Sequence, residues 1–206
     1  MSLNLIGAVE IFDVEEFSKV MAFEIMSGQW DGATAGNNYY IYYNVVSSKM
    51  EFWRYDYDAS LGALSEIQPL IDKCVFDWAN GTTEPLVLRL MSIPSFVDLV
   101  AEKIWRLLDT GYDGSPDSLW TLRGKAYLNM LSYLVPQDRW WRIDTAYSMQ
   151  DFHNSWNSTL IREPVLPLEA ASAHIIGIGQ FLERRSSTAR AQLLGKDPSC
   201  TPVSAS

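Results

Sequence analysis

Two aromatic-rich runs, Tyr39–Tyr43 and Met50–Tyr55, follow each other closely, with the polar segment Asn44–Ser48 between them. Aromatic and β-branched residues favour strands, and a short polar connection between two such runs predicts a β-hairpin. An antiparallel hairpin returns the chain to its starting point. This pattern constrains the fold most, because it should bring residues 31–38 close to residues 56–58.

Oxygen-bearing side chains stand at both ends of this predicted hairpin: Asp31, Asn37 and Asn38 before it, and Asp56 and Asp58 after it. Carboxylate and amide oxygens are preferred ligands of Mg²⁺ and Mn²⁺. Phosphoryl transfer to a hydroxyl also needs a carboxylate that orients the hydroxyl or accepts its proton. The order of these residues therefore suits a catalytic loop followed by a metal ligand. The alternative is structural, because Asp-Gly favours turns, Asn caps strands and Asp-Tyr-Asp can end a strand in solvent.

Outside this stretch, apolar spacing and capping residues predict helices. One helix should begin at the N-cap Asp13, place Phe17, Met21 and Glu24 at helical spacing, and end at Gly28. Further helices are expected from a capping box at Ser95–Asp98 through Leu108, over Asp117–Leu134, from Ser148 and Asp151 toward Ile161, and over Leu168–Leu194. The predicted class is α+β and mostly α, with one aromatic β-hairpin followed by a helical bundle.

Charge and hydropathy exclude several classes of partner. The 206 residues, 48% of them hydrophobic, suffice for one domain with a sizeable core. A formal net charge of −9 offers no basic surface to nucleic acid. No apolar run is long enough to predict a membrane span, and acidic residues within the first thirty positions argue against a signal peptide in this chain. Cys74 and Cys200 lack metal-ligand spacing, and their disulfide status is left open.

Two further features have an ordinary structural interpretation. The aromatic hairpin and the Trp140-Trp141 pair could stack on sugars, but we expect these aromatic residues to pack in the core or between helices. The Glu183-Arg184-Arg185 segment could contact an anion, but a solvated helix face is the expectation.

Residues 30–62 resemble the core signature of the CotH kinase family, spore-coat and surface proteins with an atypical protein-kinase-like fold. That signature has Trp-Asp or Asn-Asp before Gly, then Asn-Tyr-Tyr-Leu-Tyr, then an aromatic strand that ends in Asp-x-Asp-x-x-x-Gly. The corresponding residues here are Trp30-Asp31-Gly32, Asn38-Tyr39-Tyr40-Ile41-Tyr42, and Asp56-Tyr57-Asp58 with Gly62. The family's usual Pro in the aromatic strand is replaced by Arg54. Looser similarity in "IPSFVDLVAEKIWRLL", "VPQDRWW" and "FLERRSSTARAQL" extends the resemblance over residues 10–194.

The resemblance implies an ATP-dependent protein phosphotransferase that acts on Ser or Thr with Mg²⁺ or Mn²⁺. Asp31 would be the catalytic carboxylate, and Asn37 and Asn38 would orient the nucleotide phosphates. Asn38, Asp56 and Asp58 would hold the metal. The replacement by Arg54 removes none of these ligands. Relatives of this kind are often extracellular or on the spore or cell surface, and their partners are protein substrates or coat proteins.

A kinase also needs an N-terminal lobe that covers the nucleotide phosphates, and only about thirty residues precede Asp31. We therefore interpret residues 1–194 as the CotH-like portion that follows the N-lobe, expected to be incomplete or inactive alone, and residues 195–206 as a polar tail. Such a portion should expose a large apolar surface near residues 31–62. Two alternatives remain: a non-catalytic surface or coat-protein binding module, and a structural Ca²⁺ site at Asp56 and Asp58.

Overall fold

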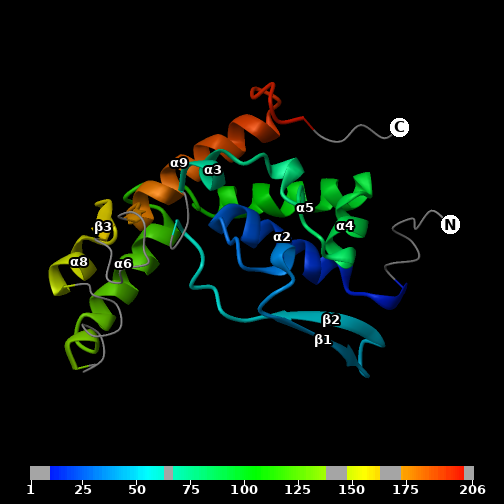
Figure 1. Ribbon diagram of the computed structural model, residues 1–206, viewed down its shortest axis with the longest axis horizontal. Coiled ribbons are helices and arrows are strands. Elements are labelled where there is room, and N and C mark those ends of the chain that lie inside the picture. Colours follow the sequence, from blue (N-terminus) through cyan, green and yellow to red (C-terminus); the bar gives the residue numbers. More distant parts are fainter. Residues whose placement is uncertain (1–9, 63–66, 138–147, 163–172, 202–206) are drawn as a thin grey trace.

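The computed structural model describes residues 10–62, 67–137, 148–162 and 173–201. Helix α2 (Val14–Ser27) lies centrally, beside α5 (Pro94–Asp109) and below α9 (Ile178–Leu193), with the hairpin β1–β2 beneath it (Figure 1). The described residues also form shorter helices: α3 (Ile67–Asp72), η2 (Val75–Asp77), α4 (Pro85–Met91), α6 (Leu119–Leu131), η3 (Val135–Gln137) and α8 (Met149–Asn154). The predicted mostly-α class is confirmed.

Helix α2 begins and ends at the predicted residues. The Asp13 side chain accepts a hydrogen bond from the backbone N–H of Glu16 at 3.0 Å, so it caps the helix as expected. Gly28 ends the helix in the left-handed conformation, with φ 65°. Phe17 and Met21 are fully buried on the face that packs against α5 and the hairpin. This helix is therefore the centre of the core, and its last turn leads directly into residues 28–38.

The N-terminus of α5 differs from the prediction. Its apolar stripe is buried as expected, but Pro94 is the first helical residue and Ile93 is the N-cap, with no side-chain capping bond. The predicted capping box at Ser95–Asp98 is therefore wrong. Proline has no N–H to leave unsatisfied and its φ already suits a helix, so it starts the helix one residue before the Ser.

Strands β1 (Tyr39–Asn44) and β2 (Lys49–Arg54) form the predicted antiparallel hairpin, with Tyr39 opposite Arg54 and Asn44 opposite Lys49. On its inner face, the Phe52 ring stacks on Tyr39 at 4.5 Å and meets the Phe17 ring at 4.7 Å. These ring contacts dock the hairpin onto α2, because edge-to-face and stacked aromatic pairs stabilise beyond their buried area.

The outer face of the same hairpin is exposed. Tyr40 and Trp53, which pair across the strands, are 66% and 62% exposed. Tyr40 stacks on Tyr55 at 5.1 Å, and Tyr42 meets Trp53 edge-to-face at 6.4 Å. The expectation that the hairpin aromatic residues pack in the core therefore holds for the inner face and is wrong for the outer one. Trp140 and Trp141 lie outside the described residues.

The C-terminal region contains a second small sheet that the sequence did not predict. Strands β3 (Leu160–Arg162) and β4 (Ala173–Ile175) pair antiparallel where helix was expected. The predicted capping box of Ser148 and Asp151 is present, but α8 ends at Asn154. Residues 168–172 of the predicted last helix lie outside the described residues, and α9 begins at Ile178. No described helix is both long and apolar enough to span a membrane.

Arg185 on α9 is fully buried, contrary to the expected solvated face. Its guanidinium donates hydrogen bonds to the backbone carbonyls of Ile25 at 3.1 Å, Ile71 at 2.8 Å and Lys73 at 2.7 Å. These carbonyls lie at the C-terminal ends of α2 and α3, where a cation is favoured by the helix dipole and by unsatisfied oxygens. Arg185 therefore fastens three helices together.

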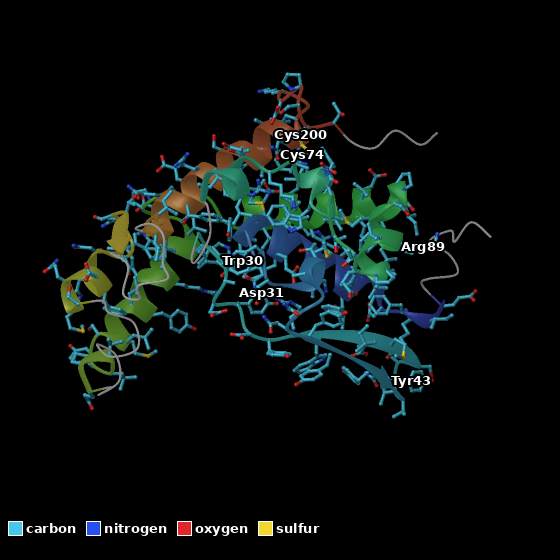
Figure 2. All side chains as sticks on the ribbon, in the orientation of Figure 1. Trp30, Asp31, Tyr43, Cys74, Arg89 and Cys200 are labelled. Atoms are coloured by element: carbon cyan, nitrogen blue, oxygen red, sulfur yellow. A yellow bond between two sulfur atoms is a disulfide. The ribbon has the colours of Figure 1, made fainter. Side chains whose placement is uncertain are left out.

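A disulfide joins Cys74, before η2, to Cys200, after α9 (Figure 2). The two residues are 126 positions apart in the sequence, and their Cα atoms are 5.2 Å apart. Cys200 is buried, so the start of the predicted polar tail is fixed to the body of the molecule.

Candidate functional site

The loop that connects α2 to β1 carries the first group of candidate residues. It contains the short helix η1 (Ala33–Ala35), which ends at Gly36 with φ 75°. Trp30 and Asp31 lie below α2 and above the start of the hairpin (Figure 2). The loop therefore lies between the helical core and the start of the hairpin.

Asp31 is held by the side chains of both candidate asparagines. The Asn37 amide donates to Asp31 Oδ1 at 2.7 Å, and the Asn38 amide donates to Asp31 Oδ2 at 3.1 Å and to the Asp31 carbonyl at 3.0 Å. Each carboxylate oxygen retains further acceptor capacity. The Asp31 carboxylate is thus fixed in one orientation and can still accept a hydrogen bond from a substrate hydroxyl.

Asp56 and Asp58 follow β2 and are exposed to solvent. The backbone places Asp56 near the loop, because the Tyr55 N–H donates to the Asn38 carbonyl at 3.1 Å and the buried Gln29 side chain donates to the Asp56 carbonyl at 3.0 Å. No described hydrogen bond or ion pair joins either carboxylate to Asp31 or Asn38. The structure therefore brings Asp31, Asn37 and Asn38 into contact, and it brings the two later aspartates to the same end of the hairpin only through the backbone.

Two of the candidate ligands have left-handed backbones. Asn38 has φ 58° and Asp56 has φ 57°. Asn and Asp tolerate this region better than most non-glycine residues, but a conformation of this kind persists only where its surroundings hold it. The loop and the residue after β2 are therefore fixed in a specific shape at two of the three candidate metal-binding positions.

A buried ion pair lies beneath the loop. Arg54 Nε is 2.6 Å from Glu24 Oε1, and these side chains are 1% and 0% exposed. The Ala33 N–H donates to both Glu24 oxygens, at 3.0 and 3.1 Å. Arg54 Nη1 donates to the carbonyl of Asn37 at 2.8 Å and to that of Asn38. The pair therefore connects α2, β2 and the loop that carries Asp31.

Burial governs the ionisation of Glu24. Desolvation raises the pKa of the Glu24 carboxyl from 4.5 to about 7, and Arg54 together with the Ala33 N–H opposes this rise to a smaller extent. The pair also explains why residue 32 is a glycine. A Cβ at this position would lie 2.5 Å from Glu24 Oε1 and 2.8 Å from Arg54 Nη2.

Sequence reasoning did not identify Glu24 and Arg54 as a unit. In the sequence, Arg54 stands out only as a departure from the family pattern. The available signal was Glu24, which follows Phe17 and Met21 on the apolar face of its helix. An acidic residue on a buried stripe requires a partner, because an unpaired buried charge is too costly.

The donor types present fit a hard divalent cation. Asp31, Asp56 and Asp58 offer carboxylate oxygens, and Asn37 and Asn38 offer amide oxygens. Both asparagines direct their amide nitrogens to Asp31, and in the described part of the chain their Oδ1 atoms accept no hydrogen bond. Those two oxygens are available as ligands. The described residues contain no cluster of three or more His, Cys, Asp or Glu that could hold a metal ion.

The sequence of this region matches a known protein family. A family model described as CotH kinase protein matches residues 7–111, half of the chain. The match covers the α2 helix, the candidate loop, the hairpin, Asp56, Asp58 and helix α5. It ends before α6, so the looser similarities noted in "VPQDRWW" and "FLERRSSTARAQL" lie outside it. A search of curated proteins found no match.

Proposed function

This chain belongs to the CotH kinase family, and on that premise we propose that residues 30–62 form the catalytic and metal-binding part of a phosphotransferase. The proposed reaction moves phosphate from ATP to a Ser or Thr hydroxyl of a protein, with Mg²⁺ or Mn²⁺. The family to which the chain belongs is described as a kinase family. The protein substrate, the nucleotide and the metal are part of this proposal.

The contact between Asp31 and the two asparagine amides is the observation that carries the proposal. A carboxylate that must orient a hydroxyl has to be fixed in position before the substrate arrives. The bonds from Asn37 at 2.7 Å and Asn38 at 3.1 Å provide that orientation. Asp31 would accept the proton of the acceptor hydroxyl as the oxygen–phosphorus bond forms.

Asn38, Asp56 and Asp58 are the residues proposed to hold the cation, and Asn37 would orient the nucleotide phosphates. A bound divalent ion would neutralise charge on the transferring phosphoryl group. With a formal net charge of −9, the chain would otherwise repel a nucleotide. The exposed carboxylates of Asp56 and Asp58 form no ion pair with a described Lys or Arg, so they are accessible to solvent cations.

Calorimetric titration of Mn²⁺, followed by ATP, into the wild-type chain and two variants tests these roles. Asp56→Asn keeps the shape and removes a charged ligand, so Mn²⁺ affinity should fall at least tenfold and ATP binding should fall with it. Asp31→Asn should weaken both affinities less than Asp56→Asn does, because Asp31 is not a ligand and contacts only the asparagine amides. Asp98→Asn, on the exposed side of α5, is the matched control.

The pattern of losses decides between the roles. Equal losses of Mn²⁺ affinity in Asp31→Asn and Asp56→Asn would contradict the proposal that Asp56 binds the metal and Asp31 does not. Unchanged affinity in Asp56→Asn would remove the metal-ligand assignment. Phosphate transfer to a Ser- and Thr-containing protein, where it is measurable, should fall by orders of magnitude in both variants.

The exposed outer face of the hairpin favours a second candidate function, a non-catalytic module that binds a surface or coat protein. Tyr40 and Trp53 present a contiguous aromatic surface beside the candidate site. Exposed aromatic surfaces of this kind mark interaction sites. A chain that binds no Mn²⁺ or ATP would favour this function, and one stabilised by Ca²⁺ alone would favour a structural Ca²⁺ site at Asp56 and Asp58.

A further inference from the structure

The guanidinium of Arg54 is placed to control the backbone of the candidate site. In the hairpin register Arg54 lies opposite Tyr39, the residue that follows Asn38. From there its Nη1 donates to the carbonyls of both Asn37 and Asn38, while its Nε faces Glu24. One side chain therefore links the core helix to the two residues whose amides hold Asp31.

These bonds explain how Asn38 keeps its left-handed backbone. The Asn38 carbonyl accepts hydrogen bonds from the Arg54 side chain and from the Tyr55 N–H at 3.1 Å. With its carbonyl fixed and φ at 58°, Asn38 can direct its amide back to the Asp31 carboxylate at 3.1 Å. If the carbonyl were released, the residue could return to the negative φ that most residues prefer, and the amide would move away from Asp31.

The chemistry of the pair fits a positioning role better than a contribution to overall stability. A buried ion pair costs desolvation that its attraction only partly offsets, so it often adds little net stability. Arginine presents several donors in a fixed plane, which lysine cannot reproduce. The Arg54 guanidinium contacts the Glu24 carboxylate and the carbonyls of Asn37 and Asn38 at the same time.

We propose that Arg54 is a positioning residue for the candidate metal site: anchored by Glu24, it fixes the Asn37–Asn38 backbone and thereby the two amides that orient Asp31. This inference rests on the proposed function for its link to metal binding. Groups that orient the ligands of a metal typically change its affinity tenfold to a hundredfold when altered. Arg54 is therefore expected to affect Mn²⁺ binding although it is not a ligand.

The chain offers a matched control in Arg185. This residue is equally buried and also donates to backbone carbonyls, but those carbonyls lie at the ends of α2 and α3. Arg54→Lys and Arg185→Lys thus make the same chemical change at two places. Glu24→Gln is a milder third variant, because it keeps the shape and removes only the charge that anchors Arg54.

Two readouts are needed, amide hydrogen exchange and Mn²⁺ affinity, both measured at a temperature at which circular dichroism shows each variant folded. The Asn37 N–H, bonded to the Gly32 carbonyl at 3.1 Å, and the Tyr55 N–H report on the loop. The Val75 N–H, bonded to the Gln192 side chain at 3.1 Å, reports on the surroundings of Arg185.

Arg54→Lys should accelerate exchange at Asn37 and Tyr55 about tenfold and weaken Mn²⁺ binding at least tenfold. Glu24→Gln should also accelerate exchange at these two amides and weaken Mn²⁺ binding, but to a smaller extent. Arg185→Lys should accelerate exchange at Val75 and leave Mn²⁺ affinity within about threefold. Equal weakening of Mn²⁺ binding by the two lysine variants would overturn the proposal, since it would show a general loss of structure.

The exchange readout separates this proposal from the proposed function. If the wild-type chain binds no Mn²⁺, the proposed metal site fails, and exchange still reports whether Arg54 holds the loop. Unchanged exchange at Asn37 and Tyr55 in Arg54→Lys would overturn the positioning role whether or not metal binds. If that variant itself fails to fold, unchanged exchange in Glu24→Gln would have the same consequence.

Discussion

Replacing Glu24 with Gln should remove one contribution to the pH dependence of the unfolding free energy. Burial raises the pKa of the Glu24 carboxyl to about 7 from 4.5, so the folded state holds its proton more tightly than the unfolded state does. A carboxyl raised in this way stabilises the fold fully below its unfolded pKa, and this stabilisation is lost as the pH rises through the folded pKa. The sensitive interval is therefore about pH 4.5 to 7.

The expected size follows from the difference between the two pKa values. At about 1.4 kcal/mol for each pH unit, the change from 4.5 to about 7 corresponds to roughly 3 kcal/mol. Because the Gln variant has the same shape but cannot titrate there, other carboxyl groups cancel in the comparison. Between pH 8 and pH 4.5, the wild type should gain about 3 kcal/mol of unfolding free energy relative to Glu24→Gln.

Urea unfolding, followed by far-UV circular dichroism at half-unit pH intervals, measures this difference. A difference of opposite sign would refute the reasoning, because it would show that attraction to Arg54 outweighs burial and lowers the pKa of Glu24. A flat difference would show that the two effects cancel. Arg54→Met should shift the sensitive interval to higher pH, because Arg54 lowers the pKa of Glu24.

Three further predictions concern the rest of the molecule. Replacing Cys74 and Cys200 with Ser should lower the unfolding free energy by up to about 5 kcal/mol, since the disulfide closes a separation of 126 residues; the same stability with and without reductant in the wild type would contradict this. Arg185→Leu should cost about 3 kcal/mol or more in urea unfolding, because it leaves buried carbonyls unpaired, and a cost below about 1 kcal/mol would argue against the fastening role. Trp53→Ser should raise solubility and change stability by less than about 1 kcal/mol, because Trp53 is 62% exposed; a larger loss would show that the outer face is packed in solution.

The elements that the sequence predicts well are those with local signals. Asp13 and Gly28 define both ends of α2 through contacts within a few residues, and Ser148 with Asp151 does the same at the start of α8. The hairpin follows from its aromatic composition. Where two local signals competed, as at Pro94 and Ser95, the proline determined the boundary. The three-residue strands β3 and β4 are too short to leave a periodic pattern.

The same distinction between local and distant contacts applies to the candidate site. Asp31, Asn37 and Asn38 lie within eight positions, so their contacts are local in the sequence. The pairing of Glu24 with Arg54 depends instead on how the hairpin docks against α2, which local sequence does not specify. Contacts between distant residues, including the disulfide and the carbonyls bound by Arg185, become visible only in the folded chain.

The most direct test of the central claim is to locate bound Mn²⁺ by its paramagnetic broadening of nuclear magnetic resonance signals. Substoichiometric Mn²⁺ should first broaden the side-chain amide signals of Asn37 and Asn38 and the backbone amides around Asp56, and ATP should strengthen this selectivity. Asp56→Asn should abolish the selective broadening. Broadening that is spread over exposed acidic residues elsewhere, or that is unchanged in Asp56→Asn, would contradict a metal site in this loop.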